Sequence, residues 1–434
     1  MQLPKFPILA WRKHYNKDKF TDDILAAIIV AIMLIPQALA YATLAELPPE
    51  TGIYASIFGL IAYSLFGSSN TLSVAPVAVV SLMTATALGR LGLTSPEALI
   101  AAATTLALLS GAMLLLLGFL RLGFLANFIS SPVITAFINA AVIIIAFSQL
   151  RTLLGVDGNG QNLPELITSL ATRLQQTNGL TLTLGLTALA FMFWCKRGLK
   201  NVLLRLGINQ RIATLLTRSG PLFVVAISAL LAYGLNLQSR GVRVLGNIPD
   251  GLPGIAIPPL EVDLLLGLWG SALLISIIGF VESVSVAKNL AAKRHEQINL
   301  DQELVGLGAA NVSSAFGGGF PVTGGFARSV VNFDAGAATP AAGLMSALIL
   351  LPVALLFTPL LYWIPQVSLA AIILVAIAAL IDFSPLRRAW THSKADFVVF
   401  IMTFILTLLI GIEIGIASGI ILSLLIRLYK TSRL

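Results

Sequence analysis

Long runs of apolar residues, separated by short polar stretches, dominate this chain of 434 residues. A run of about 20 apolar residues predicts a helix that crosses a lipid bilayer, and shorter runs are expected where such a helix is broken. Spans are predicted at Ile24–Leu44, Ile53–Phe66, Val74–Leu88, Ala98–Leu120, Pro132–Phe147, Leu180–Trp194, Pro221–Leu235, Leu264–Ala287, Leu304–Ala315, Phe326–Ala338, Ala341–Tyr362, Leu369–Ile381, Phe397–Leu409 and Ile414–Ile426. The pattern therefore predicts an all-α integral membrane protein with fourteen transmembrane segments.

The composition supports this class. The chain is 57% apolar and 11% charged, whereas soluble domains carry about 25% charged residues. Residues 1–22 form a basic arm that we expect to lie on the membrane surface, and no cleavable signal peptide is found. The single cysteine, Cys195, excludes a disulfide within the chain, and its apolar surroundings indicate a packing role.

The positive charges test the count of spans. If the loops alternate between the two sides of the membrane, 21 of the 27 Lys and Arg residues fall on one side, together with both termini. The other side holds only Arg90, Arg151, Arg173, Arg240 and Arg243. By the positive-inside rule, both termini are predicted to be cytoplasmic. The net charge of +8 is therefore explained by topology, and it does not indicate a nucleic-acid partner.

Two polar, glycine- or serine-rich breaks occupy corresponding places in the two halves of the chain. They are Ser68–Pro76 and Gly317–Gly325, and each is predicted to be extended backbone at the third span of a seven-span half, spans 3 and 10. Seven is odd, so the halves must have opposite orientations, which predicts 7+7 inverted repeats. Matching breaks in such repeats indicate a midplane binding site. The alternative is a pair of ordinary loops outside the membrane, which conflicts with the charge alternation.

Arg328 is the one Lys or Arg that cannot be placed in a water-facing loop or at a helix end. A cation at membrane depth is costly and usually marks a substrate or ion pathway. The helices after the two breaks would direct their N-termini toward one point, each with about half a positive charge. Together with Arg328, they predict a site that holds a small anion and repels cations.

The first span of each half should flank this point. In the first half, Pro36 frees a backbone carbonyl, and Gln37 either satisfies that carbonyl or donates to a ligand. In the second half, Glu282 lies deep in an apolar helix and must be paired, hydrated or protonated. Glu282 is either a static partner of Arg328 or a group whose protonation is linked to transport.

These motifs resemble those of the SulP sulfate-permease family, also called solute-carrier family 26. The resemblance lies in Ile35–Ala42, Leu47–Tyr54, Phe66–Met83 and the tract from Glu282 to Arg328, and it extends over essentially the whole chain. It implies a core domain (23–120 and 264–362, spans 1–4 and 8–11) and a gate domain (121–263 and 363–428, spans 5–7 and 12–14). The gate would supply the scaffold and the contacts of a homodimer. Residues 429–434 would begin a linker to a cytoplasmic STAS domain that the chain lacks, and we expect a truncation there.

The resemblance also implies which residues line the anion site. Arg328 would be joined by Gln37 and Tyr41 from span 1, Val77 from span 3, and Phe326 and Ala327 from span 10. Glu282 stands where cation-coupled members of the family place a coupling carboxylate. Several animal members have an aromatic residue where this chain has Val77 and a hydroxyl where it has Ala327. Fewer side-chain donors would leave backbone N–H groups and Arg328 to bind the anion.

The predicted function is secondary active transport of a small anion of the sulfate, bicarbonate or dicarboxylate class, with H⁺ or Na⁺ as the coupling ion. A bacterial inner membrane is the expected location, with lipid around the spans. Alternatives are an uncoupled anion channel, uniporter or exchanger, and a nucleobase permease, which would not need Arg328. No enzyme, metal or cofactor is expected. His14, His295 and His392 lie outside the apolar spans, and no nucleotide-binding Gly-x4-Gly-Lys motif occurs.

Overall fold

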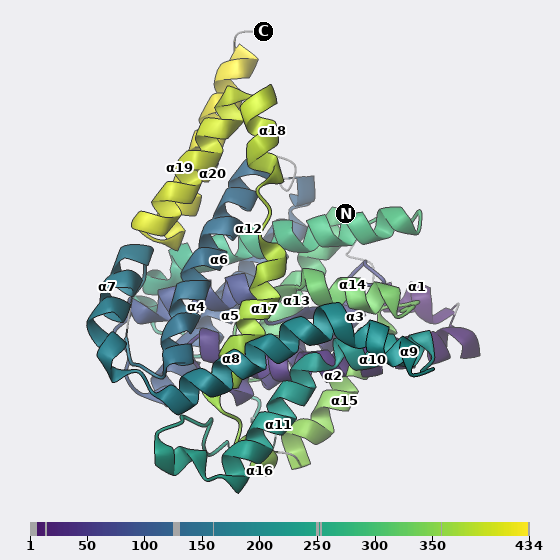
Figure 1. Ribbon diagram of the computed structural model, residues 1–434. Coiled ribbons are helices and arrows are strands. Elements are labelled where there is room, and N and C mark those ends of the chain that lie inside the picture. The colour runs from purple at the N-terminus through teal and green to yellow at the C-terminus, as the bar shows by residue number, and fades with distance from the viewer. Residues whose placement is uncertain are drawn as a thin grey trace.

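A computed structural model describes residues 7–13, 15–124, 131–158, 160–248, 251, 254–356 and 358–432. These residues are almost entirely helical (Figure 1). The helices of the first half are α1 (Pro7–Lys13), α2 (Lys17–Leu44), α3 (Glu50–Phe66), α4 (Ala78–Gly89), α5 (Pro96–Phe119), α6 (Ser131–Leu154), α7 (Leu163–Arg173), α8 (Gly179–Trp194), α9 (Lys200–Arg205), α10 (Gln210–Arg218) and α11 (Gly220–Gly234).

The second half contains α12 (Val262–Lys293), α13 (Leu300–Phe316), α14 (Phe326–Asp334), α15 (Ala341–Leu356), α16 (Thr358–Leu361), α17 (Gln366–Ile377), α18 (Ser384–His392), α19 (Lys394–Leu409) and α20 (Ile412–Ser432). Two short strands, β1 (Val74–Ala75) and β2 (Thr323–Gly324), lie just before α4 and α14. The extended stretches predicted before these two helices are therefore present.

Each predicted apolar segment contains a helix, although the boundaries differ. For example, α6 continues past Phe147 to Leu154, and α14 ends at Asp334 rather than Ala338. In the described part of the chain, six helical stretches are long and apolar enough to cross a membrane. They are Lys17–Leu44, Pro96–Phe119, Ser131–Leu154, Gly179–Arg205, Val262–Lys293 and Gln366–Thr391. Several other apolar helices are shorter, so the count of fourteen crossings and the inverted repeat stay predictions.

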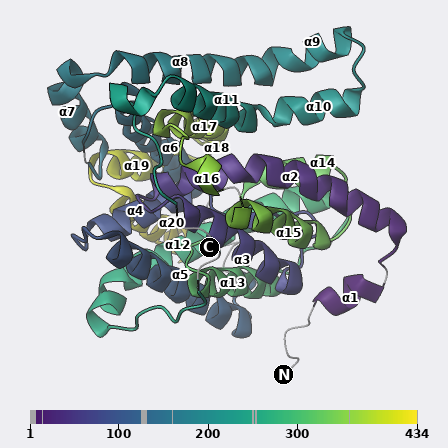
Figure 2. The same ribbon diagram turned by 90° about the horizontal axis from the view of Figure 1, so that it is seen from below.

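The helices pack in two groups. Helix α13 packs on α3 and α5, and α15 packs on α2 and α3, while α17 packs on α6 and α8, and α19 on α6 and α20. Figure 2 shows α8 and α11 along one side of the molecule and α5 and α13 along the opposite side, with α2 between them. Helices α2 and α17 are in direct contact, so the two groups meet along α2.

Close helix approach in the first group depends on small residues. A Cβ added to Gly111 of α5 would lie 2.9 Å from the carbonyl oxygen of Gly308 in α13, and a Cβ on Gly308 would lie 3.0 Å from that of Gly111. Because neither residue has a side chain, the two backbones touch at this crossing. Small residues stabilise helix pairs in membranes in this way.

Candidate functional site

The strands β1 and β2 place the beginnings of α4 and α14 side by side. They pair antiparallel, with Val74 opposite Gly324 and Ala75 opposite Thr323. The pairing is extended by hydrogen bonds from the Gly325 N–H to the Ser73 carbonyl (3.1 Å) and from the Ser73 N–H to the Ser329 hydroxyl (3.0 Å). Two broken segments that lie about 250 residues apart in the sequence therefore form one unit.

Both helices begin with free backbone donors. The first intrahelical bond of α4 runs from the Ser81 N–H to the Val77 carbonyl (2.9 Å), and that of α14 runs from Ser329 to Gly325 (3.0 Å). The three N–H groups before each of these bonds have no acceptor within their helix. Neither helix has a side-chain cap on its N-terminus. The two positive dipole ends are therefore available to a ligand.

At the C-terminal end of α14, two arginines form hydrogen bonds with the helix. Arg294 donates to the carbonyl oxygens of Ala337 (2.6 Å) and Phe333 (3.2 Å), and Arg218 donates to the Asp334 carboxylate (2.8 Å). Positive charge at a helix C-terminus complements the helix dipole. The C-terminal end of α14 is thus bonded within the protein, and its N-terminal end is left open.

Arg328 is buried between the two helix beginnings, with only 2% of its surface exposed. Its Nη1 donates to the Pro76 carbonyl (2.8 Å) and its Nη2 to the Ala75 carbonyl (3.1 Å), while its Nε has no partner. The guanidinium lies against Gly325, where an added Cβ would be 2.8 Å from Nη2. No carboxylate forms an ion pair with Arg328 among the described residues, although Glu282 is within electrostatic range.

Two predicted site residues of α2 lie at this point. Gln37 and Tyr41 are one helical turn apart and both are buried. The Gln37 Oε1 accepts from the Arg328 Nη1 at 3.5 Å, at the long limit of a hydrogen bond. Tyr41 lies near enough to Arg328 for the two groups to interact electrostatically.

The residues that begin the two broken helices have different environments. Val77 is buried, and a Cβ on Gly325 would lie 3.3 Å from its side chain. Phe326 and Ala327 start α14 but are exposed, Phe326 to 47%. The structure therefore brings Gln37, Val77 and Arg328 into one cluster, with the side chains of Phe326 and Ala327 at its open edge.

Glu282 lies in the middle of α12, and its Oε2 is buried without a hydrogen-bond partner. It forms no ion pair with Arg328 in the described part of the chain, although the two charges are within electrostatic range. Its neighbour Ser283 is hydrogen-bonded to the Thr323 hydroxyl (2.7 Å) and to the Gly324 N–H (2.8 Å). Thus α12 holds β2 in place and carries an unpaired carboxylate beside it.

Sequence reasoning missed a second buried carboxylate, Glu303 of α13. Its two oxygens accept hydrogen bonds from the Tyr63 hydroxyl (2.7 Å), the Ser68 N–H (2.8 Å), the Ser68 hydroxyl (2.6 Å) and the Ser69 N–H (3.0 Å). These bonds fix the chain that leads into β1. Glu303 was placed outside the predicted span that starts at Leu304, and its partners lie about 235 residues away. Only the run of serines in the first break hinted that a buried acceptor was needed.

The same fold occurs in solved structures of transport proteins. A structure of SLC26A9 superposes with a TM-score of 0.90 at 23% identity, covering 98% of this chain and 68% of that one. The transmembrane domain of the cyanobacterial bicarbonate transporter BicA superposes with a TM-score of 0.77 at 20% identity, covering 94% of this chain and 98% of that domain. The chain therefore has the same fold as these two proteins.

Sequence comparison defines the family. The chain belongs to the sulfate permease family, whose pattern matches residues 20–403. It is 34% identical to sulfate transporter 4.1, a chloroplastic protein of Arabidopsis thaliana, over 92% of this chain and 57% of the relative. It is 33% identical to the sodium-independent sulfate anion transporter of Bos taurus, over 92% of this chain and 68% of the relative. The resemblance inferred from the sequence is confirmed, and these relatives are named as transporters rather than enzymes.

Proposed function

We propose that the chain is a secondary active transporter of a small anion of the sulfate, bicarbonate or dicarboxylate class. The observation that carries this proposal is the meeting of two open helix N-termini at Arg328, a buried cation without a carboxylate partner. A bound anion would accept from the free N–H groups and neutralise the guanidinium at once. Gln37, Tyr41, Val77, Phe326 and Ala327 would surround it.

Coupling to H⁺ or Na⁺ is assigned to Glu282. A carboxylate oxygen that is buried without a donor is costly when charged, unless a proton or cation joins it. Its position beside β2 would let a bound cation act on the strand that sets the start of α14. Anion and cation would then stabilise the same arrangement of the site, which is the thermodynamic basis of coupling.

Alternating access would be a movement of the core (23–120 and 264–362) against the gate (121–263 and 363–428). Three of the four ion pairs in the described part of the chain join these two domains: Arg151–Glu46, Arg218–Asp334 and Arg90–Glu413. Each includes a partner that is well exposed, so each contributes little to stability and can separate at low cost.

The proposed topology has fourteen spans in 7+7 inverted repeats, both termini in the cytoplasm, and a bacterial inner membrane as the location. Contacts of the gate would form a homodimer, and lipid would surround the spans. The helices that begin at β1 and β2 would then be the broken spans 3 and 10, which meet from opposite sides of the membrane.

Uptake into proteoliposomes tests the function. Labelled sulfate, bicarbonate and a dicarboxylate are supplied with and without an inward proton or sodium gradient. Accumulation of one anion above its own equilibrium, driven by one of the gradients, is the expected result. Flux that only follows the anion's own gradient would indicate a channel or uniporter, and uptake that needs an internal anion would indicate an exchanger.

A further inference from the structure

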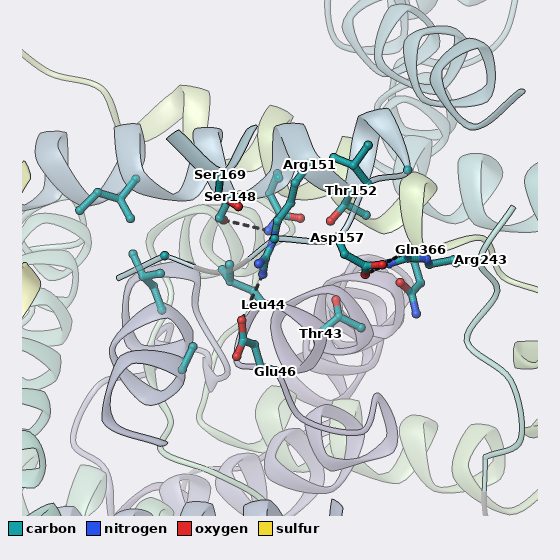
Figure 3. A pocket seen from close by; sticks show the side chains of 18 of the residues that line it. Thr43, Leu44, Glu46, Ser148, Arg151, Thr152, Asp157, Ser169, Arg243 and Gln366 are labelled. Atoms are coloured by element: carbon teal, nitrogen blue, oxygen red, sulfur yellow. Dashed lines mark hydrogen bonds and ion pairs between the residues drawn. The ribbon is translucent and has the colours of Figure 1, made fainter. Parts of the chain in front are cut away.

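A large cavity lies apart from the Arg328 site. Its volume is about 780 Å³, and none of the predicted site residues lines it. Its walls are the end of α2, α4 from Leu82 to Gly89, the end of α6 and the loop after it, α7, and the starts of α8 and α17 (Figure 3). The cavity follows α4 from Gly89 to Leu82, and Leu82 lies four residues, or about 6 Å, from the start of that helix. It therefore leads toward the helix end where Arg328 is bound.

Three arginines line this cavity, and only two carboxylates accompany them. The arginines are Arg151, Arg173 and Arg243, and the carboxylates belong to Glu46 and Asp157. The lining thus carries one excess positive charge. Arg243 is bound to Asp157 through two parallel bonds of 2.7 and 2.9 Å, so these two charges neutralise each other.

The three arginines have one charged neighbour in common, Asp157. Asp157 lies in the loop after α6, and the hydrogen bonds and charge of Arg243 hold the pKa of its carboxyl group below the ordinary value. Arg173 and Arg151 lower that pKa further through their charges. All three arginines are therefore within electrostatic range of Asp157.

Among the three arginines, Arg151 has an ion-pair partner that an anion could displace. It makes a single bond of 3.1 Å to Glu46, whose side chain is 53% exposed (Figure 3). Single, exposed ion pairs contribute little and are readily replaced. Arg173 makes no hydrogen bond or ion pair within the described residues. Neutral donors, among them Ser148, Gln149 and Thr181, line the same space.

The backbone at Glu46 fixes the end of α2, as it does at the helix ends formed by Arg121 and His295. The N–H of Leu47 bonds to the Ala42 carbonyl (3.0 Å) and that of Glu46 to the Thr43 carbonyl (3.1 Å), which is a Schellman motif at the end of α2. Glu46 holds the left-handed position of this motif, at φ 60°, where glycine is usual. A carboxylate is thus kept at a position that disfavours a side chain, opposite Arg151.

We propose that this cavity contains a second anion site, centred on Arg151, which takes a small oxyanion before it reaches Arg328. Glu46 occupies the Arg151 guanidinium while no anion is bound and is displaced when one arrives. The planar guanidinium suits sulfate, bicarbonate or a carboxylate better than a halide, because two of its N–H groups can bond two oxygens at once. This inference rests on the proposed function, since it makes the cavity the entry path to the transport site.

Equilibrium binding of labelled sulfate to the purified full chain at low ionic strength tests the site without requiring transport. In an Arg328→Gln background, a second sulfate site should remain, and adding Arg151→Gln should weaken it about tenfold or more. Glu46→Gln should instead tighten it about threefold, because the competing carboxylate is gone. All of these effects should shrink as salt is added.

The matched control is Arg240→Gln, which removes an exposed arginine from the same predicted side without touching the cavity. It should leave sulfate affinity within twofold of the parent. The inference is overturned if Arg151→Gln binds as tightly as its background, or if Arg240→Gln weakens binding equally, which would indicate a general surface potential. A different result would overturn the proposed function alone. If the parent chain binds sulfate at Arg151 but moves no anion into proteoliposomes, the proposed function is wrong and the second anion site is retained.

Discussion

Replacing Arg328 with glutamine should weaken anion binding and also lower the stability of the fold, and a matched variant can separate the two effects. The guanidinium is 2% exposed and donates to two carbonyl oxygens, those of Pro76 and Ala75. It also supplies the one full positive charge at the meeting of the two helix ends. The substitution therefore removes two structural bonds and the charge that a bound anion would meet.

The two losses differ in size. A hydrogen bond to a charged group contributes about 1.5–3 kcal/mol, which corresponds to an anion affinity about 10- to 150-fold weaker. The bonds from the charged guanidinium to the two carbonyls fall in the same range, so the free energy of unfolding should fall by about 3–6 kcal/mol. Glutamine can donate to one of these carbonyls, which makes this an upper figure.

The assay is binding of labelled sulfate to purified protein, paired with thermal unfolding of the same samples. Arg294→Gln is a matched control, because Arg294 also donates to two carbonyl oxygens, but at the far end of α14. It should lower stability by a similar amount and leave affinity unchanged, while Arg328→Lys should keep most of the affinity. Sulfate affinity of Arg328→Gln within threefold of the parent would refute the anion-site reasoning.

Substitutions at three further positions separate coupling, structure and packing. Glu282→Gln should abolish gradient-driven accumulation and flatten the pH dependence of uptake with little loss of stability, because Oε2 has no hydrogen-bond partner among the described residues; an unchanged pH profile would make Glu282 structural. Glu303→Ala should lower the free energy of unfolding by about 3–5 kcal/mol, since it leaves four donor groups without their acceptor, two of them fully buried. Glu303→Gln keeps an acceptor for Ser68 and should lower the free energy of unfolding by only about 1 kcal/mol. Equal losses of stability in the two Glu303 variants would contradict this. Gly325→Ala should lower the free energy of unfolding by about 1–3 kcal/mol and weaken sulfate binding, because its Cβ would press on the Arg328 guanidinium. If this variant has the stability and the sulfate affinity of the parent, the guanidinium can move aside.

The sequence alone was sufficient to predict the helices and to single out Arg328, which lies where the two broken helices begin. Apolar runs in a membrane protein must be helical, because lipid offers no partner to backbone N–H and C=O groups. Each predicted apolar segment accordingly contains a helix. Arg328 and Glu282 could be found for a related reason, since a charged residue inside an apolar run is evident from the sequence alone.

The sequence predicted that the two broken segments meet, but only the tertiary structure showed which residues pair. The β1–β2 ladder, the bonds of Glu303 to Ser68 and Ser69, and the Arg151–Glu46 ion pair all join residues separated by 100 positions or more. Each of these residues lies in a polar stretch or at a helix end, where charge and hydroxyl groups are ordinary and give no local signal. Their roles depend on burial and on a partner's position, and both are set when the helices pack against one another.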